Sequence, residues 1–377
     1  MKIIIAIDSF KGSLSSISAA KAVASCALEV YPDSEVITLP VADGGEGTAF
    51  ALTEGLGGRM ESLSVTGPLG EKVKAKYGMI GKTAVIEMSE AAGITLITPH
   101  KRDPMITTTF GVGEMILDAI GKGCRDFIIG IGGSATNDGG AGMLEALGFE
   151  LLDGNGEPVR RGAIGLKDIK TISDSKVSPL LRQSSFRVAC DVTNPLLGEL
   201  GCSRIYGPQK GADEKTVSLM DEYMKNYAEA AKRYNEKADE DLPGAGAAGG
   251  MGFAFSSFLG ASLVSGIDLI LDMIGLEDKL SGADLVITGE GRLDSQTVMG
   301  KVPIGVAKAA KKHGIPVIAF SGCIGDGAEI CNSHGIDAFF PILRKICTIE
   351  EAMDEETAYN NLKNTARQVF LLRNVIK

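Results

Sequence analysis

One local pattern recurs along the chain: a short β-branched run, then a turn of glycine and carboxylate residues, then a helix. It starts at residues 3–7, 35–41 and 284–288. The helix expected at residues 16–31 has apolar residues spaced to form one buried stripe. Strands that alternate with helices through short connections are typical of parallel βαβ units. The pattern therefore predicts an α/β protein built on a parallel sheet.

The chain is long enough for two domains, because 377 residues exceed what one hydrophobic core usually holds. The middle of the chain differs in pattern from its two ends. Between them, residues 65–76 and 83–88 look like strands of a mixed sheet. We therefore expect a discontinuous α/β domain of residues 1–64 and 285–377, with a second α/β domain of residues 65–284 inserted into it.

The strongest ligand signal lies in residues 127–142, which read FIIGIGGSATNDGGAG. A short apolar strand runs into a turn with several glycines, and a helix follows. Glycine tolerates positive φ and lets backbone N–H groups crowd around a ligand. The first N–H groups of the following helix have no partner within the helix, so they suit an anion. We predict a phosphate site at this turn.

Other polar turns also follow predicted strands, where the carboxyl ends of parallel strands place ligands. The turns at residues 8–13, 43–48, 191–195 and 289–294 each carry a carboxylate soon after the strand. Helix capping would explain any one of them, since Asp and Ser are good N-caps. Together they favour a ligand site. Residues 243–252, PGAGAAGGMG, form either an interdomain linker or a loop that closes over a ligand.

Composition excludes several functions. The net charge of −10 argues against a nucleic-acid partner, which requires a basic patch. The seven cysteines form no CxxC pair and the three histidines lie far apart, so neither a disulfide framework nor zinc is expected. No apolar run approaches the ~20 residues of a membrane span, and the N-terminal run is too short for a signal peptide. We expect a cytoplasmic protein with no membrane partner.

Metal-assisted phosphoryl transfer suits these turns. It needs N–H groups for phosphate, a carboxylate for Mg²⁺, cations for the spreading charge and a carboxylate to accept a hydroxyl proton. No Walker A motif is present, because Gly300-Lys301 is followed by Val302 where Ser or Thr is required. Serine–histidine hydrolysis is poorly supported, since no histidine falls in these turns. Local cations in glycine-rich contexts are Lys11, Arg204, Lys210, Arg292 and Lys301.

Two alternatives remain. Residues 130–135 fit the G-x-G-x-x-A fingerprint of an NAD-dependent dehydrogenase, with Glu150 or Asp153 ~20 residues further on. Against this, the helix expected at residues 140–147 is short for a βαβ crossover, and Asp138 would repel a pyrophosphate. The second alternative is a non-catalytic sensor of a phosphorylated metabolite, which would leave the carboxylates unexplained.

Seven motifs, in order from the first strand to the last part of the chain, resemble those of the bacterial type 1 glycerate kinase family. They lie at residues 8–12, 43–48, 132–140, 191–196, 206–212, 244–252 and 288–294. The resemblance implies ATP- and Mg²⁺-dependent phosphorylation of D-glycerate, with 2-phosphoglycerate favoured over 3-phosphoglycerate. It also implies two α/β domains, one of them flavodoxin-like with a doubly wound parallel sheet, and an active site in the cleft between them. The oligomeric state stays open.

The same resemblance suggests individual roles. Asp191 is the candidate base for the glycerate hydroxyl, and Lys11 and Asp294 complete the candidate catalytic set. Candidate substrate-binding residues are Asp8, Ser9, Lys11, Asp43, Asn194 and Arg292. Candidate ATP- or phosphate-binding residues are Gly132, Gly133, Ser134, Thr136, Asn137, Gly246 and Gly249. Candidate metal ligands are Asp138 and Glu290, within a pool that also includes Asp43 and Asp294.

Overall fold

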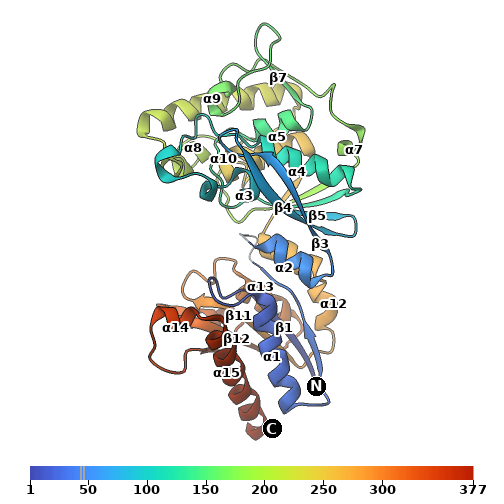
Figure 1. The fold of residues 1–377 in the computed structure, drawn as a ribbon, viewed down its shortest axis with the longest axis vertical. Coiled ribbons are helices and arrows are strands. Elements are labelled where there is room, and N and C mark those ends of the chain that lie inside the picture. Colours follow the sequence, from blue (N-terminus) through green and yellow to red (C-terminus); the bar gives the residue numbers. More distant parts are fainter. Residues whose placement is uncertain (43–44, 46, 377) are drawn as a thin grey trace. The chain divides into compact units, whose positions relative to one another are not determined.

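The computed structural model describes residues 1–42, 45 and 47–376 and confirms the predicted α/β class (Figure 1). The chain forms two compact units. Unit 1 consists of Met1–Asp43 and Ile267–Lys377, and unit 2 of Gly44–Gly266. Among the described residues, no helix is long and apolar enough to cross a membrane. The cytoplasmic location stays a prediction.

Unit 1 has a five-stranded, fully parallel sheet in the order β13-β12-β11-β1-β2. Numbered within the unit, this is the order 2-1-3-4-5 of flavodoxin-like folds. The strand order reverses between β1 and β11, which is the position where sheets of this topology generally bind ligands. The strands are β1 (Lys2–Ile7), β2 (Glu35–Thr38), β11 (Leu285–Leu293), β12 (Val317–Ile324) and β13 (Ala338–Pro341).

Helices α1 and α15 pack against each other and against one face of this sheet. Ile3, Ile5 and Ile7 of β1 point to that face and are fully buried there, because alternate residues of a strand share a side. Helix α13 contacts β11 and β1. The helices of unit 1 are α1 (Ser16–Val30), α11 (Gly266–Met273), α12 (Leu276–Leu280), α13 (Val302–Lys312), α14 (Ile349–Met353) and α15 (Glu355–Ile376), with the 3-10 helix η4 (Ala328–His334).

Unit 2 contains the predicted mixed sheet, in the order β10-β9-β6-β5-β4-β3. Strands β3, β4 and β5 are antiparallel, whereas β5, β6, β9 and β10 run parallel. The strands are β3 (Arg59–Thr66), β4 (Lys72–Ile80), β5 (Thr83–Glu87), β6 (Asp126–Gly130), β9 (Ser185–Ala189) and β10 (Ser262–Val264). A separate hairpin-like pair is formed by β7 (Glu150–Leu152) and β8 (Thr171–Ser173).

The core of unit 2 is aromatic on one side of the sheet. Phe127 of β6 stacks on Phe186 of β9 with ring centroids 4.8 Å apart, and Phe255 packs beside them. The helices are α2 (Thr48–Gly55), α3 (Ser89–Ala92), α4 (Phe110–Gly121), α5 (Ala141–Ala146), α6 (Ala163–Leu166), α7 (Pro179–Arg182), α8 (Cys202–Tyr206), α9 (Glu214–Tyr234) and α10 (Ala247–Leu259). Three 3-10 turns are η1 (Ile94–Leu96), η2 (Pro99–Lys101) and η3 (Pro208–Lys210).

The units divide the chain after residues 43 and 266 rather than after residues 64 and 284. Strand β3 pairs with β4 from Arg59 to Thr66, so its first residues lie in the sheet of unit 2. Helix α2 also packs on β3, β4 and β5. Because a strand and the helix covering it share one core, the chain from Gly44 onward clusters with unit 2.

Helix α10 begins with three consecutive left-handed residues: Ala248 (φ 52°), Gly249 (φ 66°) and Gly250 (φ 93°). Glycine adopts this conformation freely, but an alanine Cβ crowds the following carbonyl oxygen. Ala248 is the only non-glycine residue with positive φ in the described part of the chain. Its backbone is therefore held by its surroundings against its own preference.

We expect Ala248→Gly to raise the free energy of unfolding by about 1 kcal/mol, because glycine relieves the left-handed strain. Urea unfolding measures this. The control is Ala254→Gly, in the regular part of the same helix, which should lower the free energy of unfolding by about 1 kcal/mol or more. Equal destabilisation by both substitutions would contradict the strain at residue 248.

Candidate active site

In unit 1, the candidate residues after β1 lie beside those at the end of β11. The Asp8 N–H donates to the Gly289 carbonyl at 2.9 Å, and the Asp8 side chain is 5% exposed. A Cβ on Gly291 would lie only 3.4 Å from the Lys11 nitrogen, so the turn holding Lys11 rests on that glycine. The structure thus gathers Asp8, Lys11 and residues 289–292 at the strand-order reversal, where flavodoxin-like sheets bind ligands.

Two carboxylates flank the exposed Arg292 in this region. Asp294 lies 3.1 Å from the Arg292 Nε and also accepts the Gln296 N–H at 2.9 Å. Glu290 is buried and accepts the Thr297 hydroxyl at 2.7 Å. The Arg292 side chain is 63% exposed, so its guanidinium can still reach an anion. Arg292 and the exposed Lys11 give this edge positive charge that suits an anion.

In unit 2, strands β5, β6, β9 and β10 end at one edge, since Glu87, Gly130, Ala189 and Val264 are register partners in turn. Gly132 and Gly133 follow β6 and are exposed there. Gly133 has φ +73°, and a Cβ on Gly132 would meet nothing within 4 Å. The Gly133 carbonyl accepts the Ile94 N–H at 2.8 Å, which fixes the turn from one side. Both glycines present accessible backbone to a ligand.

The next residues of this loop turn inward. Thr136, Asn137 and Asp138 are 0% exposed, and Ser134 is 9% exposed. The Asn137 amide donates to the Ser203 hydroxyl at 2.9 Å. These side chains therefore hold the loop in place, whereas direct contact with ATP remains open to the two exposed glycines before them.

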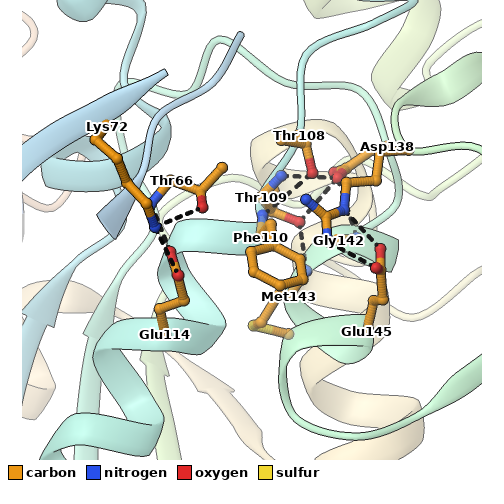
Figure 2. A network of polar contacts seen from close by, with 11 residues as sticks. Thr66, Lys72, Thr108, Thr109, Phe110, Glu114, Asp138, Gly142, Met143 and Glu145 are labelled. Atoms are coloured by element: carbon orange, nitrogen blue, oxygen red, sulfur yellow. Dashed lines mark hydrogen bonds and ion pairs between the residues drawn. The ribbon is translucent and has the colours of Figure 1, made fainter. Parts of the chain in front are cut away.

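Asp138 is the anchor of the inward part (Figure 2). Its carboxylate accepts the Thr109 N–H at 2.8 Å, the Thr109 hydroxyl at 2.9 Å, and the N–H groups of Gly140 and Gly142 at 3.2 Å. Burial raises the pKa of the Asp138 carboxyl, and these hydrogen bonds oppose the rise. Four donors occupy the lone pairs that a metal ion would need, so the geometry favours a structural role for Asp138.

Gly246 and Gly249 are buried where two backbones meet. A Cβ on Gly246 would lie 2.2 Å from the Pro195 carbonyl oxygen, and one on Gly249 would lie 2.1 Å from the Thr136 carbonyl oxygen. The Gly249 carbonyl also accepts the Gly139 N–H at 2.9 Å. Residues 244–250 thus pack directly on the phosphate-loop candidate, and only glycine allows that approach. These contacts explain both glycines without a contact to ATP.

Asp191 and Asn194 differ although they share one loop. Asp191 follows β9, is exposed, and accepts the Gly266 N–H at 2.9 Å. Asn194 accepts the Tyr206 hydroxyl at 2.7 Å and donates to the Leu200 carbonyl at 2.8 Å. The amide of Asn194 therefore serves the loop itself, while the Asp191 carboxylate lies at the sheet edge that also carries Gly132 and Gly133.

Glu87 is a functional candidate that sequence reasoning missed. It ends β5, is 6% exposed, and accepts the N–H groups of Gly47 at 3.1 Å and Ala49 at 2.7 Å. It thereby caps the start of α2, which follows the predicted turn at residues 43–48. Asp43 lies outside the described residues. The sequence signal that could have identified Glu87 is its position as a carboxylate at the end of the apolar run at residues 83–87.

Both units thus carry polar loops at a strand edge, with exposed cations in one unit and a glycine loop beside an exposed carboxylate in the other. Similarity to known proteins identifies this protein as a kinase. The chain belongs to the glycerate kinase family, whose model, described as "Glycerate kinase family", matches residues 3–374. This membership replaces the dehydrogenase and sensor alternatives.

Individual relatives agree with this assignment. The chain is 49% identical to the glycerate 2-kinase of Escherichia coli (strain K12) over 98% of this chain and 97% of the relative. It is 46% identical to the glycerate kinase of Halalkalibacterium halodurans, over 98% and 97% of the two chains. A crystal structure of a glycerate kinase 2 from Salmonella typhimurium LT2 matches with a TM-score of 0.92 and 46% identity, covering 100% of this chain and 98% of that one.

We expect Asp138→Asn to lower the free energy of unfolding by about 2–4 kcal/mol in the absence of any ligand. The NH₂ of the new amide is a donor and cannot accept the hydrogen bonds that backbone N–H groups now donate to the carboxylate. Those N–H groups would be left unpaired. Urea unfolding measures the change. Asp153→Asn is the control, because that carboxylate also accepts backbone N–H groups but is only half-buried, and it should cost less than about 1 kcal/mol. Equal midpoints for Asp138→Asn and the wild type would contradict the anchoring role.

Proposed function

We propose that this chain phosphorylates D-glycerate with ATP and Mg²⁺ and releases 2-phosphoglycerate. The observation that carries the proposal is the match, at 49% identity along nearly the full length of both chains, to a protein named glycerate 2-kinase. The regiochemistry follows from that relative's name. The loop chemistry described above supports the reaction class independently, since it offers anion-binding groups and an exposed carboxylate.

We infer that loops of both domains contribute residues to the active site. Each unit supplies one part of the needed chemistry. Lys11 and Arg292 of unit 1 offer exposed cations, and Asp191, Gly132 and Gly133 of unit 2 offer a base and a phosphate-binding turn. Neither edge alone carries the whole set, which is why we propose that the two act together.

ATP would bind through its phosphates to the exposed backbone of Gly132 and Gly133, with Ser134 at the edge of that contact. Thr136, Asn137, Gly246 and Gly249 would then act indirectly by shaping the loop, because they are buried. D-Glycerate would place its carboxylate against Lys11 or Arg292, with Asp8 and Ser9 in the loop that carries Lys11. Asp43 stays a candidate on its sequence motif alone. Charge-assisted hydrogen bonds from a guanidinium suit a carboxylate well.

Asp191 is the proposed general base. As the O2 oxygen of glycerate attacks the γ-phosphorus in line, its proton passes to the Asp191 carboxylate, and the bond to ADP breaks. The carboxylate is exposed, and one of its oxygens accepts the Gly266 N–H, which orients it. Asp294 is the second carboxylate considered for this role, although its pairing with Arg292 favours a positioning function.

The residues of unit 1 fit a magnesium ion. Mg²⁺ usually takes one or two carboxylates and completes its shell with phosphate oxygens and water. No group of three or more His, Cys, Asp or Glu residues suited to a metal occurs in the described ranges. One carboxylate is enough, and we assign that role to Glu290, with Asp8 nearby. The bound ion would neutralise phosphate charge during transfer.

The purified protein should consume ATP when D-glycerate and Mg²⁺ are present, and phosphorus NMR should show 2-phosphoglycerate. Removing Mg²⁺ with a chelator should stop the reaction, and restoring the ion should recover it. Formation of 3-phosphoglycerate alone would overturn the regiochemistry. No turnover with any short hydroxy acid would overturn the proposed function.

We expect Asp191→Asn to lower kcat by about 10²–10⁴-fold, because an amide cannot accept the hydroxyl proton. Steady-state kinetics with D-glycerate measures it, and the thermal midpoint should stay near that of the wild type. The matched control is Asp239→Asn, an exposed carboxylate of unit 2 that likewise accepts one backbone N–H. A loss of less than about tenfold would move the base role to Asp294 or Asp43.

A further inference from the structure

Lys210 is buried beneath the glycine loop. It ends the 3-10 turn η3, its side chain is 2% exposed, and its ammonium donates to the Thr136 carbonyl at 2.6 Å. Lysine is almost never buried so completely without a specific partner, because its charge loses hydration. The structure gives it a backbone carbonyl of the loop rather than a carboxylate in contact. Such a costly contact calls for a reason beyond packing.

The Thr136 carbonyl is held from two directions. Lys210 donates to its oxygen, and the Cα of Gly249 approaches so closely that a Cβ there would lie 2.1 Å from the same oxygen. Beyond it, the Gly139 N–H is tied to the Gly249 carbonyl. The peptide three residues after Gly133 is therefore clamped, while Gly132 and Gly133 themselves remain exposed. These contacts fix the backbone at Thr136, where the loop turns from the exposed glycines into the interior of unit 2.

The groups around Lys210 are also buried. The titratable groups near the Lys210 ammonium are Asp138 of the loop and Cys202 of α8. Tyr227 of α9 is buried near Asp138, whose charge acts on it. Asp138 is already engaged by four donors, so it does not serve as a dedicated counter-ion. The Asn137 Oδ1 and Tyr227 hydroxyl find no hydrogen-bond partner among the described residues. The Thr136 carbonyl is thus the group that the ammonium contacts.

We propose that Lys210 is a positioning residue for phosphoryl transfer, which holds the Thr136 peptide so that Gly132 and Gly133 face the transferring phosphoryl group. The inference rests on the proposed function of this loop. Lys210 touches neither substrate nor nucleotide in this role, and it acts through the loop backbone. Its removal should therefore affect the transition state more than the binding of glycerate.

The same role predicts a pH dependence of the activity. Burial lowers the pKa of the Lys210 ammonium to about 8, and the negative charge of Asp138 opposes this shift. Burial raises the pKa of the Cys202 thiol to about 11, so that thiol stays neutral where Lys210 titrates. The unfolded chain holds its lysine protons to about pH 10.4, so this group makes the folded state more stable as the pH rises from about 8 to 10.4. The charged contact to Thr136, and the activity that depends on it, would fall as the pH rises through about 8, the pKa of Lys210 in the folded protein.

The test uses Lys210→Met, which keeps the volume and removes the charge, with Lys225→Met as the control. Lys225 is an exposed lysine of α9. We expect kcat of Lys210→Met to fall about 10–100-fold, with KM for D-glycerate within about threefold of the wild type. The wild type should lose kcat/KM above about pH 8, and Lys210→Met should lack that decline. The thermal midpoint at pH 7 should not fall, since the variant removes a buried charge.

The outcomes separate the two claims. No turnover by the wild type would count against the proposed function, whereas equal kcat for the wild type and Lys210→Met would overturn the role of Lys210 alone. A shared decline above pH 8 in both proteins would overturn it as well. Should Lys210→Met fail to fold, the wild-type profile decides. The inference requires kcat/KM to decline near pH 8 while the thermal midpoint holds, and an unchanged kcat/KM to about pH 9.5 contradicts it.

Discussion

The buried carboxylate of Asp138 is the interaction on which the glycine loop of unit 2 depends. It draws four donors, from Thr109, Gly140 and Gly142, into one point under the loop. A buried carboxylate left without these donors would be strongly destabilising, so the loop and the start of α4 and α5 are held together. Lys210 and Gly249 hold the Thr136 carbonyl, two residues before Asp138. The exposed Gly132 and Gly133 therefore emerge from a rigid base.

In unit 1, the candidate loop residues are positioned by the topology of the sheet. Its strand order reverses between β1 and β11; the loop after β1 carries Asp8 and Lys11, and Arg292 lies near the end of β11. In sheets of this topology, the ligand-binding position arises because successive helices connect to opposite faces of the sheet. A buried polar cluster is not needed to create it. Close backbone packing at Gly291 brings the Lys11 turn onto β11. The two units therefore position their candidate loops in different ways. Unit 2 uses buried hydrogen bonds to Asp138, and unit 1 uses the reversal of its strand order.

Much of the fold could be predicted from local patterns, and parts of the site could not. Apolar runs followed by glycine turns gave the parallel strands, because strand and turn propensities act over a few residues. The inward direction of Thr136, Asn137 and Asp138 was not predictable, since the same letters would suit an exposed phosphate turn. Their burial depends on α8, α9 and α10, which lie far away in sequence. The roles of Glu87 and Lys210 were hidden for the same reason, and the true course of β3 moved the first boundary to residue 43.

The most direct test of this account is native-state hydrogen exchange at the loop amides, with and without a non-hydrolysable ATP analogue and Mg²⁺. The account predicts strong protection at residues 138–142 in both conditions, because the Asp138 anchor does not depend on ligand. It predicts that Gly132 and Gly133 exchange readily in the free protein and become protected when the nucleotide binds. Unchanged exchange at these two glycines, or nucleotide-dependent protection confined to residues 138–142, would contradict it.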